Sequence, residues 1–142
     1  LGGSVSWDFS MSEDGATPRW YYSTGVLTTS NPNMIAGLTG QSSTYTDGTT
    51  VSTTDKVRIA YIEHLGVDED GNASVDDDKM SLSPQGNNWS AAYRLQLDPG
   101  EAMVLKFKTD GTASGVTVAS FEGDMKQNTA KVKVLAICDD VA

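Results

Sequence analysis

The residues best suited to chemistry begin with an acidic cluster. Asp68, Asp70 and Asn72 alternate within a short segment, and oxygen donors at alternating positions on a tight loop are what Ca²⁺ prefers. The register does not fit an EF-hand, because counting from Asp68 puts Ala73 where the loop needs Gly and Lys79 where it needs Glu. The cluster is therefore either a weak Ca²⁺ site at Asp68, Asp70 and Asn72 or a solvated acidic turn, and we favour the turn.

Reactive side chains are few. His64 is the only imidazole, and its neighbour Glu63 should point to the opposite face of a strand, so the two cannot form a dyad. We expect His64 to be a part-buried residue bonded to a loop. Cys138 follows the apolar pattern of the last expected strand and reads as a small core residue. Nucleophile-elbow and phosphate-loop motifs are missing from the sequence, so we expect neither enzyme activity nor a cofactor.

Aromatic residues offer a different kind of chemistry, that of binding. Trp20, Tyr21 and Tyr22 are consecutive, and neighbours on a strand face opposite ways, so at least one of them should lie outside the core. An exposed aromatic can stack on a sugar ring or anchor a protein interface. Trp20 and Tyr22 are therefore candidate interface residues. Val5, Trp7 and Phe9 form a second candidate group, although Trp7 also suits a core position.

Charge and length limit the partners. The 142 residues fit one domain, and 10 Lys+Arg against 19 Asp+Glu give a formal net charge of -9. Phosphate backbones and anionic membrane surfaces repel such a chain, so we expect no nucleic-acid or membrane partner. No apolar run is long enough to span a bilayer, and a single Cys excludes an internal disulfide framework.

The elements that must position these residues are β-strands. Short alternating runs separated by Gly, Pro and Asp turns predict about eight strands and no long helix. The fold class is thus all-β, a single antiparallel β-sandwich or jelly-roll-like domain over residues 1–142. Turns are expected at 13–15, 98–101 and 110–111, with a polar connection at 123–128. The expected strands are 5–9, 19–22 with 26–29 as an extension or a new strand, 56–65, 80–82, 91–97, 103–108, 116–121 and 131–138.

Within 56–65, apolar residues occupy both alternating sets, with Val57, Ile59 and Tyr61 expected on one face. That pattern predicts a central strand covered on both sides.

The segment 30–54 differs from the rest because it is rich in Ser and Thr. It is expected to be a long loop with one or two short strands and a helical turn over 34–36. A structureless loop of this length is uncommon in a compact domain, so it is either an interaction arm or a layer draped across the sandwich. As an arm it would present further interface candidates, namely Met34, Ile35, Leu38 and Tyr45.

Four stretches carry a family resemblance: Leu-Gly-Gly-Ser-Val-Ser-Trp at 1–7, the strand 56–66, the Leu-Asp-Pro-Gly-Glu-Ala turn at 97–102, and the apolar run 134–141. In order and style they resemble small β-sandwich capsid decoration (cement) proteins of tailed bacteriophages. The resemblance implies a non-enzymatic virion protein on the outer capsid surface. It implies the major capsid protein as partner, bridging of neighbouring capsid subunits, and a trimeric or dimeric homo-oligomer.

Two other functions fit the same residues. A secreted filament or surface-appendage subunit could donate the strand at 1–10, with Val5, Trp7 and Phe9 as its apolar side. A carbohydrate- or Ca²⁺-binding β-sandwich module would use Trp20, Tyr22 or Trp89 as its sugar platform. Both alternatives place the protein outside the cell.

Overall fold

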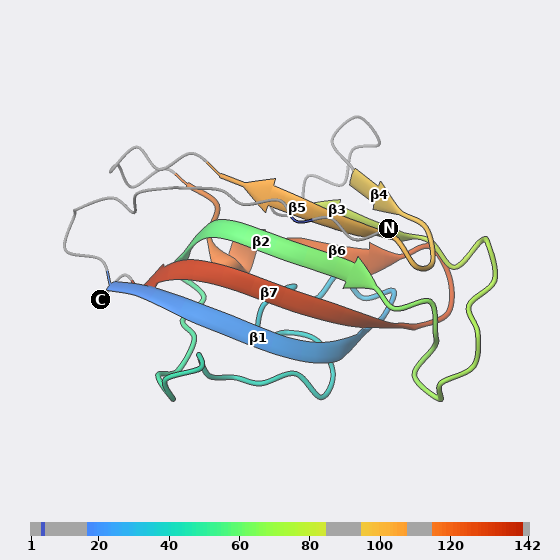
Figure 1. Ribbon diagram of the computed structural model, residues 1–142, viewed down its shortest axis with the longest axis horizontal. Coiled ribbons are helices and arrows are strands. Elements are labelled where there is room, and N and C mark those ends of the chain that lie inside the picture. Colours follow the sequence, from blue (N-terminus) through green and yellow to red (C-terminus); the bar gives the residue numbers. More distant parts are fainter. Residues whose placement is uncertain (1–3, 5–16, 85–94, 108–114, 141–142) are drawn as a thin grey trace.

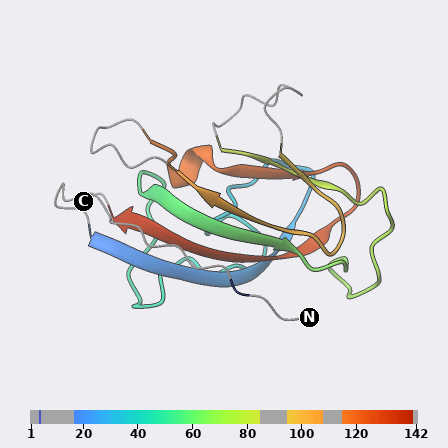
Figure 2. The same cartoon turned by 45° about the horizontal axis from the view of Figure 1, so that its top comes forward.

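The computed structural model describes residues 4, 17–84, 95–107 and 115–140 (Figures 1 and 2). Seven strands and one short 3₁₀ helix lie within these residues. They are β1 (Thr17–Leu27), β2 (Lys56–His64), β3 (Met80–Ser83), β4 (Leu95–Leu97), β5 (Ala102–Lys106), η2 (Val118–Ser120), β6 (Glu122–Met125) and β7 (Ala130–Asp140).

The strands form two antiparallel sheets. The larger has the order β1-β7-β2-β5 and the smaller the order β4-β3-β6. In Figure 1 the larger sheet lies in front of the smaller one, and the two are stacked as layers (Figures 1 and 2). The prediction of an all-β antiparallel sandwich is confirmed.

An isolated bridge between Asn33 and Glu122 places the chain after β1 beside β6, at the edge of the smaller sheet. With this bridge counted as a rudimentary strand, each layer holds four strands, and most neighbours within a layer are distant in sequence. Two such layers are the arrangement of a jelly roll. The fold is therefore jelly-roll-like, with its second strand reduced to one bridge.

The core lies between the layers and is built from alternating residues of each strand. β1 contributes Tyr21 and Leu27, and β7 contributes every second residue from Ala130 to Cys138, all of them buried. The smaller sheet and η2 supply the opposite side, from Met80, Leu82, Leu97, Val118, Phe121 and Met125. The same period-two alternation that predicts the strand 131–138 therefore marks the core side of β7.

The segment 30–54 is a layer and not an arm. Its Met34, Ile35, Leu38 and Tyr45 are at most 4 % exposed, so their assignment as interface residues is wrong. These four side chains belong to the same buried cluster as Tyr21 and Leu27 of β1. In Figure 1 the segment runs along the β1 side of the sandwich.

Backbone hydrogen bonds fix this layer in place. Val26 and Thr39 exchange N–H···O bonds of 2.9 and 3.2 Å, and the Met34 N–H donates to the Phe121 carbonyl at 2.8 Å. Residues 34–36 form a turn and not the expected helical turn, and it ends at Ala36, whose φ is 60°.

Two further predictions fail near the C-terminus. Residues 116–121 were expected as a strand, yet Val118–Ser120 is a 3₁₀ turn. It is closed by a capping box in which the side chains of Thr117 and Ser120 each accept the other's N–H. The strand follows at Glu122–Met125 and overlaps the polar connection expected at 123–128. Gly and Asp disfavour strands, so only pairing with β3 reveals β6.

A β-bulge disturbs the expected pattern of β2. Val57 is aligned with Cys138 and Ile59 with Ile137, so Arg58 is an extra residue. Val57 therefore faces the core, separate from Ile59 and Tyr61, and Arg58 forms a buried ion pair with Asp139. Ile59 and Tyr61 are only half-buried, which corrects the expectation of a strand covered on both sides.

Some predictions fall elsewhere. The expected strand at 5–9 with Val5, Trp7 and Phe9, the residue Trp89, and the first part of the strand at 91–97 lie outside the described residues.

Candidate functional site

The most distinctive surface is the side of the larger sheet that faces away from the smaller one. Trp20 and Tyr22 are 55 % and 56 % exposed there, and Val104 and Leu135 are 37 % and 36 % exposed. Both aromatic candidates from the sequence are therefore displayed, and they share one face because they lie two residues apart on β1.

Strand register joins these side chains into two rows across all four strands. Trp20 is aligned with Ile137, Ile137 with Ile59, and Ile59 with Lys106. The second row runs from Tyr22 through Leu135 and Tyr61 to Val104. We name this surface the outer face, made of Trp20, Tyr22, Ile59, Tyr61, Val104, Leu135 and Ile137. Ile137 is buried among its neighbours, whereas Ile59 and Tyr61 are half-buried.

A polar border surrounds the outer face. In the next row, the Lys133 ammonium lies 3.7 Å from a Glu63 carboxylate oxygen, and the Tyr61 hydroxyl donates to the same oxygen at 3.0 Å. Desolvation and then Glu63 raise the pKa of Tyr61. Lys106 and Lys131 extend the basic side of the border. Aromatic and aliphatic side chains inside a polar border are typical of an interaction site.

Sequence reasoning missed most of the outer face. Tyr61, Val104, Leu135 and Ile137 were each visible as members of alternating runs. Their proximity depends on β7 lying between β1 and β2 and on β5 lying beyond β2, and no local pattern reveals that order.

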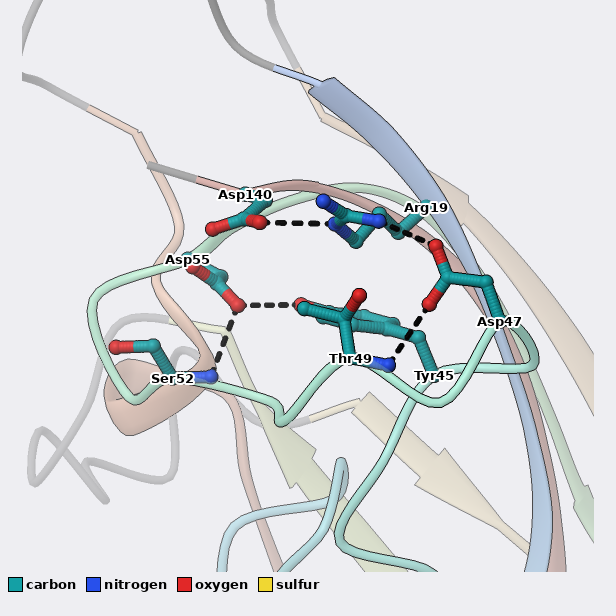
Figure 3. Close-up of polar contacts among 7 residues, drawn as sticks. All are labelled: Arg19, Tyr45, Asp47, Thr49, Ser52, Asp55 and Asp140. Atoms are coloured by element: carbon teal, nitrogen blue, oxygen red, sulfur yellow. Dashed lines mark hydrogen bonds and ion pairs between the residues drawn. The ribbon is translucent and has the colours of Figure 1, made fainter. Parts of the chain in front are cut away.

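A polar clamp holds the end of β1 that carries Trp20 (Figure 3). The Arg19 Nε donates to Asp140 Oδ2 at 2.8 Å, and the same guanidinium pairs with Asp47. Hydrogen bonds from Thr49, together with Arg19, lower the pKa of Asp47. The hydrogen bond to Asp140 is the main cause that raises the pKa of Arg19. The clamp joins β1, β7 and the segment 30–54.

A second, buried part of the clamp centres on Tyr45. Its hydroxyl donates to Asp55 Oδ2 at 2.6 Å, and the Ser52 N–H donates to the same oxygen at 2.9 Å (Figure 3). The ring of Tyr45 meets that of Tyr21 edge-on, with centroids 6.4 Å apart. Burial is the main cause that raises the pKa of Tyr45 far above its ordinary value.

Tyr21 ties the same layer to β1. Its hydroxyl donates to the Ser42 carbonyl at 2.7 Å and accepts the Ala36 N–H at 3.1 Å. Burial raises the pKa of Tyr21 to about 12. Because these phenols bond inward to their own chain, the clamp is a structural support for β1.

In the acidic loop, the carboxylate oxygens of Asp68 accept hydrogen bonds from the loop itself. Asp68 Oδ1 accepts the N–H groups of Asp70 and Asn72 at 2.9 and 2.8 Å, and the Asn72 amide donates to Asp68 Oδ2 at 3.1 Å. These bonds, led by that from the Asn72 side chain, lower the pKa of Asp68. No cluster of three His, Cys, Asp or Glu suited to a metal occurs among residues 17–84, 95–107 and 115–140. The geometry is that of the solvated turn.

His64 and Cys138 are both interior residues. His64 was expected to be part-buried and is instead fully buried. It accepts the Gly66 N–H at Nδ1, which assigns the proton to Nε2 and its 2.8 Å bond to the Asp78 carbonyl. Cys138 is buried as expected, and desolvation raises its pKa to about 12. Neither is placed to act as a base or nucleophile.

Family models, curated proteins and solved structures were all compared with the chain, and none matches it. The part of the chain that the structure describes contains no helix long and apolar enough to cross a membrane. A functional assignment therefore depends on the chemistry of the outer face.

Proposed function

We propose that this chain is a non-enzymatic virion structural protein, a capsid decoration protein that binds the outer shell and bridges major capsid subunits. The observation that carries the proposal is the outer face, where Trp20 and Tyr22 are more than half exposed beside Leu135 and Val104. Trp and Tyr are the side chains most enriched at the energetic centres of protein interfaces.

The physical logic of such a role is simple. A protein that binds the assembled shell and not the separate subunits adds its binding free energy to assembly. A dimer or trimer of this chain would engage several lattice sites at once, and avidity multiplies weak contacts. A net charge of -9 keeps the remaining surface from binding nucleic acid. By fold-level analogy alone, jelly rolls recur in capsid and lectin domains.

The experiment is sedimentation of native source material, with mass spectrometry of the heavy fractions. The chain should co-sediment with filled particles at a fixed ratio to a more abundant shell protein. Its presence only among small, slowly sedimenting species would contradict a virion role.

A variant pair then tests the face itself. Recombinant protein carrying both Trp20→Ala and Tyr22→Ala should lose binding to particles from which the native chain has been removed. A control, Gln96→Ala, changes an exposed residue of β4 on the other sheet and should bind as the unaltered chain does. Equal particle binding by the two variants would show that the shell does not contact the outer face.

A second candidate is carbohydrate binding, favoured by the same pair of aromatics on one face. Trp20 and Tyr22 lie about 7 Å apart along the strand, a spacing at which two rings can stack on successive sugars. Pull-down on insoluble polysaccharides would reveal this activity. Under this function Trp20→Ala abolishes retention on the polysaccharide and leaves the melting temperature nearly unchanged.

A further inference from the structure

We propose that two copies of this chain pair edge to edge through β5, so that their two larger sheets become one continuous antiparallel sheet. The pairing itself does not depend on the virion role. The use of such a dimer at the capsid shell rests on the proposed function.

β5 is the last strand of the larger sheet, and its outer edge carries backbone groups that face away from β2 (Figure 1). The Phe107 N–H donates to the Arg58 carbonyl of β2 at 2.9 Å. The Glu101 carbonyl accepts the His64 N–H at 3.0 Å. Successive residues of an antiparallel strand bond to alternate sides. The same alternation turns the N–H and C=O groups of three residues outward, namely Ala102, Val104 and Lys106.

The two edges of the larger sheet are treated differently. At the β1 edge, the Thr46 N–H donates to the Trp20 carbonyl at 2.9 Å. Val26 and Thr39 exchange hydrogen bonds further along the same edge. At the β5 edge, no residue of the ranges 17–84, 95–107 and 115–140 bonds to the outward groups. An open strand edge is a template for another strand.

The side chains of β5 suit burial against a further strand. Val104 is 37 % exposed on the outer face. Met103 and Leu105 face the core side and are still only half-buried. Proteins usually block an open edge with Pro or with charge near its centre, whereas Ala102–Lys106 contains no Pro and has its one charge at the end. The edge is therefore apolar on both faces.

The order of these residues fits a second copy. With Val104 opposite its own equivalent about a twofold axis, Ala102 of each copy faces Lys106 of the other. Outward backbone groups then meet outward backbone groups, and each such pair exchanges two hydrogen bonds. On the core side, the same register sets Met103 of each copy against Leu105 of the other, in pairs whose side chains approach closely. A contact of this kind is self-complementary and closes as a dimer.

Charge favours the same register. On the outer face Ala102 is aligned with Glu63, whose carboxylate lies 3.7 Å from the Lys133 ammonium. The small Ala102 side chain lets the long Lys106 side chain of the second copy reach across it toward Glu63. Each half of the contact thus brings a cation to an acidic group, while the two Lys106 residues stay about 13 Å apart along the strands.

The pairing also extends the outer face. The row from Tyr22 through Leu135 and Tyr61 to Val104 continues into Val104 of the second copy and runs back through the equivalent row. The dimer therefore displays its exposed aromatic pairs at the two ends of one continuous surface. Under the proposed function, each end contacts a different capsid subunit, and a single dimer bridges the two.

Cysteine cross-linking tests the pairing and its register together. Cα atoms of a hydrogen-bonded antiparallel pair lie about 5.5 Å apart, within the range of a disulfide. Val104→Cys should therefore form a disulfide-linked dimer under mild oxidation. Ala102→Cys is the matched control on the same edge, because its equivalent lies about 13 Å further along. Gln96→Cys is the control on β4 of the other sheet. The native Cys138 is buried, and the unaltered chain gives its background.

The Val104→Cys variant should cross-link at least about tenfold faster than either control. A mixture of the Ala102→Cys and Lys106→Cys proteins should form the mixed dimer. Equal rates for all variants would indicate random collision and overturn the proposal. Faster cross-linking of Ala102→Cys or of Gln96→Cys would place the contact in another register or on another edge and would also overturn it.

A proline variant separates pairing from folding. The Val104 N–H points away from β2, so Val104→Pro breaks no hydrogen bond of the sheet but blocks the second copy. Because a five-residue edge makes a small contact, sedimentation equilibrium should be run at about 100 μM. The unaltered chain should be dimeric and Val104→Pro monomeric, and a monomeric unaltered chain would refute the pairing. If proline unfolds the chain, Val104→Lys sets two like charges opposite each other and serves instead.

Particle binding keeps the two proposals apart. The Val104→Pro monomer should bind particles from which the native chain has been removed at least about tenfold more weakly, because avidity is lost. The variant with both Trp20→Ala and Tyr22→Ala should still dimerise and fail to bind. Undiminished binding by the monomer would overturn the use of the dimer at the shell and leave the virion role standing. A dimer that never binds particles would refute the virion role and support the pairing alone.

Discussion

The two sides of β1 use the same residue type for opposite purposes. Tyr21 is completely buried, whereas Tyr22, the next residue, is 56 % exposed. Tyr21 holds the segment 30–54 through its ring and hydroxyl, and Tyr22 is displayed beside Leu135. The contrast shows that one strand both holds the segment 30–54 against the core and displays exposed aromatic side chains, because successive residues of a strand point to opposite faces.

The largest difference between the two sides of β1 is expected when Tyr21 and Tyr22 are each replaced by Ala. Tyr21→Ala should lower the free energy of unfolding by about 3 to 5 kcal/mol, because it leaves a cavity among core residues. Tyr22→Ala should change it by no more than about 0.5 kcal/mol. Urea unfolding of the two variants measures both values. Similar losses would mean that the outer face is a packed core in solution.

The hydroxyl groups give a finer version of the same test. Tyr45→Phe removes the donor to Asp55, which is buried, and should cost about 1.5 to 3 kcal/mol. Tyr61→Phe removes a comparable bond to Glu63 at the border of the outer face, and it should cost clearly less. Thermal denaturation ranks the two. A larger loss of stability for Tyr61→Phe than for Tyr45→Phe would contradict the assignment of Tyr45 to the structural support and of Tyr61 to the border of the outer face.

Glycine provides a third comparison between the two sides of β1. A Cβ at Gly25 would lie 2.6 Å from the Leu38 Cβ and 3.3 Å from the Thr39 carbonyl, both held by the layer. Gly25→Ala should therefore cost about 1 to 3 kcal/mol through overpacking. Thr24→Ala, on the exposed side, serves as the control and should be nearly neutral. An unchanged melting temperature for Gly25→Ala would show that the segment 30–54 shifts readily to make room for the added methyl group.

The smallest effect concerns the exposed part of the clamp. The pKa of Asp47 is lowered by Thr49 and Arg19, so its charged form is favoured by folding. That contribution is present above the unfolded pKa of about 3.9 and is lost as the pH falls through the lower folded value. Asp47→Asn should therefore melt slightly below the unaltered chain at neutral pH, and the difference should vanish near about pH 2. A difference that persists in acid would exclude the charge as its cause.

Local patterns predicted much of the fold and little of the candidate site. Alternation indicated the core side of β5 and β7, because burial on one face of a sheet has period two, but it left open which of Trp20, Tyr21 and Tyr22 faces the core. It failed at Arg58, where a bulge shifts the register, and at Glu122–Met125, where pairing overrides composition. Both failures arise from contacts distant in sequence.

The candidate site shows the same limit. Trp20 and Tyr22 were identified from their types, but their neighbours on the outer face required the strand order. Met34, Ile35, Leu38 and Tyr45 were taken for interface residues because their segment is rich in Ser and Thr. Small polar residues near a turn do not show whether the apolar ones between them meet a partner or the chain's own β1.

The pairing of β1 with β7 also has a consequence for synthesis. Leu27 is aligned with Ala130, so β1 leaves the ribosome about a hundred residues before its neighbour. At ordinary translation rates this delay is roughly 5 to 20 s. During that interval Tyr21, Leu27 and the apolar residues of 30–54 have no finished sheet to pack on. Nascent chains of this protein are therefore natural clients for chaperones that shield apolar strands until the last one arrives.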